Sequence, residues 1–258
     1  MLDENITEIV IGTHSIAEAI RSKGRKVFKI ICTKEGLDEL NKKNAIAKED
    51  LKSIIVEEFS SHDFQSQAKR EYEQRGFQFK RIPSQILALT DPVVIESPDW
   101  LYKRISSGKP LKIFSLDHVT DVHNGAAILR TAAFYGVDCL LIPTKGSFGL
   151  SPGFLRVASG AAEHVKIIKC SNLSRTLRKL IDQGVHVIGF SEHADTDFAE
   201  KSLADQDVCL VMGAEDRGLS NAVARIVDKN VSIKGHGALK SLNVSVAAAI
   251  AMEKFFGA

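Results

Sequence analysis

The chain has 258 residues, of which 44% are hydrophobic and 26% are charged, which is the balance of an ordinary globular protein. This composition excludes a wholly disordered, collagen-like or coiled-coil protein. The formal net charge is only +2, so any binding of nucleic acid has to come from local clusters of basic side chains.

The first 90 residues have the pattern of a small α/β domain. In chain order, hydrophobic spacing and β-branched runs predict a strand at 7–12, a helix at 15–22, a strand at 27–32, a helix at 34–43, a strand at 54–59 and a helix at 63–75. The last helix is followed by Gly76, a typical helix stop. We expect one domain over residues 1–90.

A run of basic residues lies inside this domain, and no acidic residue stands between its first and last members. It consists of Arg21, Lys23, Arg25, Lys26, Lys29 and Lys34. A short basic run is often a solvated helix end and turn, and it can also be a set of phosphate contacts. The residues alone leave both interpretations open.

Residues 91–110 lose periodicity and contain Pro92, Pro98, Gly108 and Pro110, which predicts a linker. Beyond it, strands at 112–116, 139–142, 186–190 and 207–212 alternate with helices at 126–135, 171–183 and 243–256. This alternation predicts a mostly parallel sheet with helices on both faces, over residues 111–258. Ligands of such sheets bind beyond the carboxyl ends of the strands.

Three loops in this second part are polar and contain glycine: residues 117–125, 213–220 and 235–243. They match neither a dinucleotide fingerprint, nor a P-loop, nor a nucleophile elbow. His118 and His123 lie in the first loop with two aspartates nearby, but no third ligand follows at a suitable spacing, so we expect no metal. Ser241 and Asn243 are candidates to cap the last helix.

The four cysteines are scattered without a CxxC pair, which predicts reduced thiols of a cytosolic protein. No apolar run approaches the roughly 20 residues of a membrane span. Residues 1–10 contain neither a basic segment nor an apolar one, so we expect no secretory signal and a cytoplasmic location.

The three loops carry motifs that resemble those of the SpoU/TrmH family of RNA ribose methyltransferases, the knotted SPOUT class. The matching segments are NGAAILRTA at 124–132, VMGAEDRGLS at 211–220 and SLNVSVA at 241–247, with RVASGAAEH at 156–164 between them. The resemblance covers residues 111–258. Residues 11–16 and the helix after them are similar to the ribosomal-protein-like substrate-binding domain found in the ribosomal RNA guanosine 2′-O branch.

The resemblance implies a C-terminal trefoil knot, S-adenosylmethionine as cofactor, an RNA substrate, and a homodimer with the active site at the interface. Residues at the family's cofactor positions are Gly213, Ile233 and Leu242. Residues at its catalytic and substrate-positioning positions are Asn124, Arg130, Glu215, Ser241 and Asn243. An RNA-grasping first domain also favours phosphate contacts by Arg21, Lys23, Arg25 and Lys26.

The implied function is methylation of a ribose 2′-hydroxyl in RNA, with a guanosine of large-subunit ribosomal RNA as the favoured target. Two alternatives stay open: a transfer RNA 2′-O-methyltransferase, and a catalytically silent RNA-binding ribosome-assembly protein on the same fold. The chain departs from the family pattern in three places: Val122 replaces the usual proline, Gly125 replaces a bulkier residue, and Lys234-Gly235 replaces a Pro-Met pair.

The family proposal makes Arg130 the general base. A guanidinium with a pKa above about 12 is a poor proton acceptor. We therefore expect Arg130 to stabilise the developing alkoxide or to hold the adjacent phosphate. Glu215 is the other candidate base, although we expect it chiefly to order the motif loops.

Overall fold

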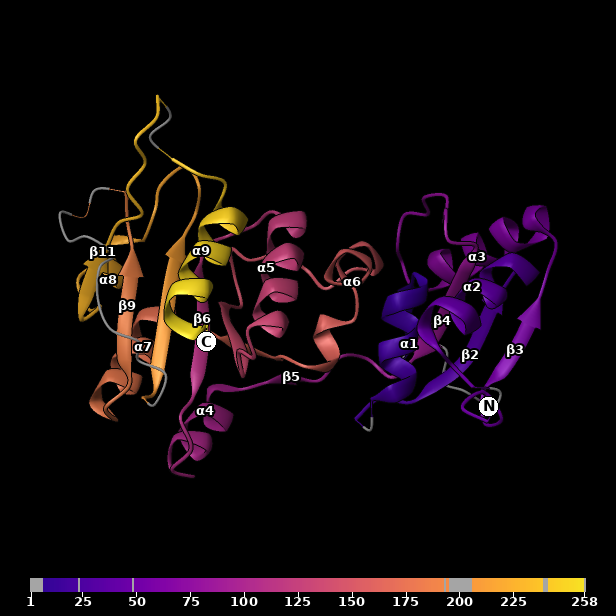
Figure 1. Ribbon diagram of the computed structural model, residues 1–258, viewed down its shortest axis with the longest axis horizontal. Helices are drawn as coiled ribbons and strands as arrows, with labels where there is room; N and C mark the ends of the chain where they lie inside the picture. The colour runs from indigo at the N-terminus through magenta and orange to yellow at the C-terminus, as the bar shows by residue number, and fades with distance from the viewer. Residues whose placement is uncertain are drawn as a thin grey trace. The chain divides into compact units, whose positions relative to one another are not determined.

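The computed structural model describes residues 7–22, 24–47, 49–192, 194, 206–238 and 241–257 (Figure 1). Its backbone contacts divide the chain into two compact units. Unit 1 consists of Met1–Val93 together with Leu150–Glu163, and unit 2 consists of Val94–Gly149 together with His164–Ala258.

Unit 1 contains a four-stranded sheet with the order β1-β4-β2-β3. The strands are β1 (Glu8–Ile11), β2 (Val27–Cys32), β3 (Ile55–Glu58) and β4 (Ile86–Thr90). Strand β4 is antiparallel to both neighbours, whereas β2 and β3 are parallel. The helices are α1 (Thr13–Arg21), α2 (Lys34–Asn44) and α3 (Ser61–Gln74).

Apolar side chains of unit 1 alternate between the two faces of this sheet, as a strand period of two requires. One face packs its Ile9, Ile11, Ile31 and Leu87 against Phe64 and Tyr72 of α3. Helix α6 (Pro152–Ala158) and the 3₁₀ helix η1 (Ala161–Glu163) also belong to this unit, where α6 packs against β1 and α1. The sequence motif at 156–164 is therefore mostly part of unit 1.

Unit 2 contains a seven-stranded sheet with the order β11-β9-β10-β6-β7-β8-β5, in which every paired neighbour is parallel. Its strands are β5 (Ile95–Glu96), β6 (Lys112–Asp117), β7 (Cys139–Pro143), β8 (Lys166–Cys170), β9 (His186–Phe190), β10 (Val208–Gly213) and β11 (Lys229–Val231).

Helices cover both faces of this sheet, as predicted. On one face α4 (Pro98–Ile105), α7 (Leu173–Asp182) and α8 (Asn221–Ala224) enclose a core that includes Leu101, Leu177 and Val223. On the other, α5 (Val122–Phe134) and α9 (Val244–Phe256) pack side by side (Figure 1). The trefoil knot implied by the resemblance stays a prediction, since residues 239 and 240, between β11 and α9, lie outside the described ranges.

The domain boundaries differ from those expected. Residues 91–110, expected to be a linker, contain β5, which pairs with β8, and α4, whose Leu101 is fully buried in the core of unit 2. Pro98 does not break structure there, because it begins α4 in the first helical turn, where proline lacks no needed donor.

Candidate active site

A cleft of about 620 Å³ lies in unit 2 where the polar loops follow β6 and β10. Neighbouring parallel strands end at the same edge of the sheet, so these loops meet although they are about 90 residues apart. The lining residues are His118, Val119, Thr120, Asp121, Asn124, Gly146, Ala214, Glu215, Asp216, Arg217, Gly218, Ser220 and Val244.

Three of the predicted site residues come together at this cleft. Asn124 lies in the first turn of α5, Glu215 in the turn after β10, and Asn243 at the N-cap of α9. Glu215 Oε1 accepts hydrogen bonds from Asn124 Nδ2 at 3.1 Å and from Asn243 Nδ2 at 2.8 Å. Asn243 Nδ2 also lies 3.0 Å from Asn124 Oδ1. The three motifs thus form one polar cluster.

Glu215 is also tied to the start of α9, where its Oε1 accepts the backbone N–H of Val244 at 3.1 Å. A carboxylate at a helix N-terminus is stabilised by the unpaired N–H groups and the helix dipole there. Asn243 accepts the N–H of Ser245 at 2.9 Å and so caps the same helix. Capping was also expected of Ser241, and this expectation is wrong, because Ser241 is exposed two residues before the cap.

The turn after β10 requires glycine at its beginning. A Cβ on Gly213 would lie 2.0 Å from the backbone carbon of Gly218, because residues 214–218 double back in a tight bridge. Gly218 has a positive φ of 66° and donates its N–H to the carbonyl of Ala214 at 2.8 Å. This tight turn places Glu215 and Asp216 at the cleft.

Asp117 and His118 form a second polar pair at the end of β6. Asp117 is 1% exposed, and its Oδ2 accepts the N–H of Ser220 at 2.7 Å. Its Oδ1 lies 2.6 Å from His118 Nδ1. In the sequence, His118 is a candidate only for a metal ligand. An aspartate that directly follows an apolar strand and precedes a histidine is the signal in the sequence for this pair.

Arg130 lies on α5 six residues beyond Asn124 and is exposed. Its side chain makes no hydrogen bond or ion pair with the described residues, so it stays outside the cluster of Asn124, Glu215 and Asn243. An unconstrained guanidinium suits contact with a ligand phosphate better than proton abstraction.

The three expected cofactor residues come from separate segments of unit 2. Gly213 ends β10, Ile233 follows β11, and Leu242 precedes the cap of α9. The side chain of Leu242 is exposed although apolar, and residues 234–238 are exposed outside any helix or strand. Exposed backbone suits the polar edge of a purine nucleoside, and an exposed apolar side chain suits its flat face. These residues therefore fit a cofactor bound largely through main-chain contacts.

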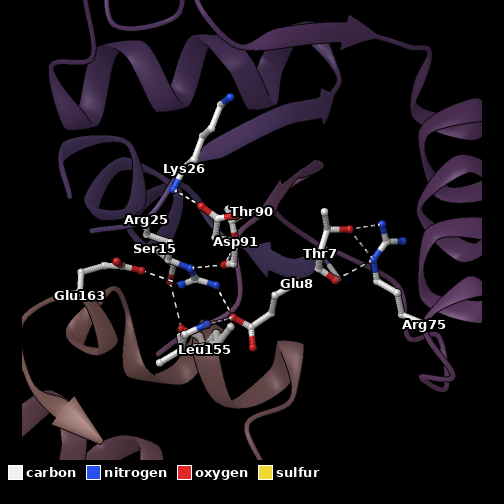
Figure 2. Close-up of polar contacts among 11 residues, drawn as sticks. Thr7, Glu8, Ser15, Arg25, Lys26, Arg75, Thr90, Asp91, Leu155 and Glu163 are labelled. Carbon is white, nitrogen blue, oxygen red and sulfur yellow. Dashed lines mark hydrogen bonds and ion pairs between the residues drawn. The ribbon is translucent and has the colours of Figure 1, made fainter. Parts of the chain in front are cut away.

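Of the four predicted RNA-contacting residues, Arg25 has a different environment from the one expected (Figure 2). Its side chain is 5% exposed, and its guanidinium donates to Glu163 Oε1 at 2.7 Å, to the carbonyl of Asp91 at 2.6 Å and to Glu8 Oε2. Burial raises the pKa of Glu8, while the charge of Arg25 acts in the opposite direction. Arg25 is thus an internal ion-pair residue of unit 1 and is not available to a phosphate.

The other basic residues of this run differ in accessibility. Lys26 is exposed, with its ammonium 5.2 Å from the ring centroid of Phe28. Arg21 pairs with Glu18 at 2.9 Å and donates to the carbonyl of Asn44. Lys23 lies outside the described residues. Contacts of Arg21, Lys23 and Lys26 with RNA stay predictions.

Comparisons with known proteins identify a family whose model spans this site. The model of the SpoU rRNA Methylase family matches residues 112–253, which include the whole polar cluster. A 23S rRNA (guanosine-2′-O-)-methyltransferase RlmB of Yersinia pestis is 30% identical over 247 residues, covering 96% of each chain. A putative TrmH family tRNA/rRNA methyltransferase of Staphylococcus epidermidis is 29% identical over 251 residues, covering 96% of this chain and 94% of the relative.

Two solved structures share the fold. The SpoU methyltransferase AviRb of Streptomyces viridochromogenes, in complex with AdoMet, aligns with a TM-score of 0.71 at 21% identity and covers 96% of this chain and 89% of its own. A putative RNA methyltransferase of the TrmH family from Porphyromonas gingivalis aligns with a TM-score of 0.70 at 22% identity, covering 97% and 89%. At these identities the likeness concerns the fold.

Proposed function

The chain belongs to the SpoU rRNA methylase family, and from this membership we propose that it methylates a ribose 2′-hydroxyl of RNA with S-adenosylmethionine as the methyl donor. We further propose a guanosine of 23S ribosomal RNA as the target, because the Yersinia relative is a 23S rRNA (guanosine-2′-O-)-methyltransferase. The observation that carries the proposal is the cluster of Asn124, Glu215 and Asn243 at the cleft beyond β6 and β10.

In this proposal some residues of unit 2 bind the methyl donor and others position the RNA substrate. Gly213, Ile233 and Leu242 would hold the donor, which supplies an electrophilic methyl group when bound. Glu215 accepts a hydrogen bond from each of the amides of Asn124 and Asn243 and so fixes both side chains. Of these two amides, that of Asn124 belongs to a residue that lines the cleft. Fixed donors near a developing alkoxide favour the transition state without reorganisation during the reaction. Arg130, exposed on the same helix as Asn124, would bind the neighbouring phosphate.

We propose a homodimer as the working form. Apolar side chains are exposed on the paired helices α5 and α9: Phe134 is 82% exposed, Val246 47% and Ile250 37%. Val246 and Ile250 are four residues apart and so lie on one face of α9. A second copy would cover this apolar face. The Val246→Glu variant is expected to sediment as a monomer, and an unchanged dimer would contradict this placement of the interface.

None of the helices in the described part of the chain combines the length and hydropathy of a membrane span. An enzyme of ribosomal RNA acts where ribosomes are assembled, so we propose a cytoplasmic location.

The test measures methyl transfer from tritiated S-adenosylmethionine to RNA of a strain that lacks this gene. We expect a single methylated nucleotide in 23S RNA. Asn124→Ala, Glu215→Gln and Asn243→Ala should each lower the single-turnover rate by about 10²-fold or more. Lys166→Ala is the matched control, because Lys166 is exposed at the amino end of β8, opposite the cleft.

Each alternative function has its own outcome in this assay. Methylation of transfer RNA alone would replace the ribosomal target. Absence of S-adenosylmethionine binding in calorimetry, together with retained RNA binding, would identify a silent RNA-binding protein. Equal rates in the three cluster variants and the control would refute the assignment of the active site.

A further inference from the structure

The pair of Asp117 and His118 has the geometry of a carboxylate that orients an imidazole. Asp117 is buried, held by the N–H of Ser220, and its other oxygen lies 2.6 Å from His118 Nδ1. A carboxylate in this position selects the imidazole tautomer with its proton on Nδ1, which leaves the Nε2 lone pair free. The His118 side chain is 57% exposed and lines the cleft, so Nε2 can be reached by a ligand.

The backbone at His118 is in a conformation that favours glycine, with a φ of 61°. Non-glycine residues in this region are uncommon and cluster at functional sites. The ring also lies against Gly146, where a Cβ would come 2.7 Å from His118 Cδ2. A strained residue and a glycine that makes room for its ring therefore keep this imidazole at the cleft.

Transfer of a methyl group to a hydroxyl releases a proton, and the other polar side chains of the cleft are poorly suited to accept it. Asn124 is an amide without basicity. Glu215 Oε1 already accepts three N–H groups, and protonation would weaken these bonds. Asp121 accepts the N–H of Asn124 at 2.7 Å as the cap of α5.

The remaining carboxylate of the cleft, Asp216, pairs with Arg217 at 3.0 Å. A guanidinium such as that of Arg130 holds its proton too firmly to act as a base. Among the described residues that line the cleft, His118 thus combines an exposed ring nitrogen with the ordinary chemistry of a general base.

We propose that His118 is the proton acceptor of the methyl transfer and that Asp117 is its positioning residue. The ribose O–H bond breaks as the new O–CH₃ bond forms, and the S–CH₃ bond of the donor breaks with its electron pair remaining on sulfur. The proton passes to His118 Nε2, and the resulting imidazolium is stabilised by the Asp117 carboxylate. This inference rests on the proposed function and assigns the role of base to His118 in place of Arg130 or Glu215.

The proton acceptor must be neutral, so the single-turnover rate should fall as the pH is lowered and the imidazole takes up a proton. The charged and titratable groups around the imidazole come from four segments. They are Asp117 on β6, Asp121 at α5, Lys145 beside Gly146, and Glu215, Asp216 and Arg217 in the turn after β10.

The first experiment uses the free wild-type protein and needs no activity. Nitrogen-15 spectra of the imidazole rings at pH 8 should show His118 with its proton on Nδ1. A proton on Nε2 would overturn the proposal, because that nitrogen could then accept nothing.

The second experiment compares His118→Gly with His123→Ala in single-turnover methylation. Glycine suits the positive φ and should leave the fold and the S-adenosylmethionine affinity unchanged. His123 is an exposed histidine outside the cleft lining and serves as the matched control. We expect His118→Gly to lower the rate by about 10² to 10⁴-fold, to lose the acid limb of the pH profile, and to regain rate with added imidazole.

A His118→Gly rate within threefold of an active wild type, with the same pH profile, would overturn the proposal for His118 alone. A wild type that methylates no RNA would overturn the proposed function as well.

Discussion

Replacing Arg25 by methionine tests whether the ion pairs of unit 1 are structural. The guanidinium of Arg25 donates hydrogen bonds to Glu8, Glu163 and the carbonyl of Asp91 (Figure 2). The Glu163 side chain is only 6% exposed. Removing one partner of a buried ion pair typically lowers the free energy of unfolding by about 3 to 5 kcal/mol, because buried charge is left uncompensated. We expect a loss of this size for Arg25→Met.

The matched variant is Glu163→Gln. It leaves Arg25 paired with Glu8 and still offers an amide oxygen to the guanidinium, so the expected loss is about 1 kcal/mol. Urea unfolding is followed by two probes, since a two-unit protein need not unfold in one step. Accessibility of Cys32, a buried residue of β2, reports on unit 1. Fluorescence of Trp100, the single tryptophan, reports on unit 2, where it packs against the core.

The unit 1 transition should shift to lower urea in Arg25→Met. Loss of Arg25 also removes the charge that opposes the raised pKa of Glu8. A carboxyl with a higher pKa folded than unfolded binds more protons in the folded state, so the free energy of unfolding increases as pH falls through that pKa. The deficit of the variant should therefore shrink from about pH 7 to about pH 5. A loss below about 1 kcal/mol at neutral pH would refute the structural role.

Three further outcomes are expected. Lys26→Ala should weaken RNA binding and reduce the salt dependence of that binding without changing the stability of the fold. Titration with RNA at several salt concentrations measures this, and an unchanged affinity would show that Lys26 does not contact RNA. Gly125→Ala should lower the free energy of unfolding by about 1 to 3 kcal/mol, because its Cβ would lie 2.4 Å from the ring of Phe148. Adding Phe148→Leu in a double variant should restore part of the lost stability, whereas a stabilised Gly125→Ala would contradict the contact. Burial raises the pKa of the Cys32 thiol to about 11, and burial also raises the pKa of the Cys170 thiol. Thiol labelling of the folded protein at pH 8 should therefore be slow, and fast labelling would show that these cysteines are not buried.

Much of the parallel sheet could be predicted from the sequence, because its central strands are apolar runs bounded by polar loops. The predicted strand at 186–190 coincides with β9. Other elements lacked such a signal. Strand β4 is buried along its whole length and shows no alternation, and β11 has only three residues. Helix α4 was hidden by the prolines around it, since proline marks both a loop and a first helical turn.

The residues of the candidate site could be predicted where they belong to sequence motifs. They could not be predicted where their placement depends on the backbone conformation or on partners distant in the sequence. Asn124, Glu215 and Asn243 meet as their motifs implied. The placement of the His118 ring at the cleft could not be predicted, because its positive φ and its contact with Gly146 are properties of the folded chain. Arg25 was expected among the RNA contacts because it belongs to a basic run. Its ion pairs with Glu8 and Glu163 could not be predicted, since a basic run does not reveal which of its residues meets an acidic partner in the fold.

The return of residues 150–163 to unit 1 also bears on how the protein is made. During synthesis, domains generally fold from the N-terminus as the chain emerges from the ribosome. Helix α6 packs against β1 and α1, Ser15 donates to the carbonyl of Leu155 at 3.1 Å, and Arg25 pairs with Glu163. Unit 1 therefore cannot complete its core and ion pairs until Glu163 has left the exit tunnel. By then residues 94–149 have already been translated, so β5, β6 and β7 of unit 2 exist before unit 1 is finished.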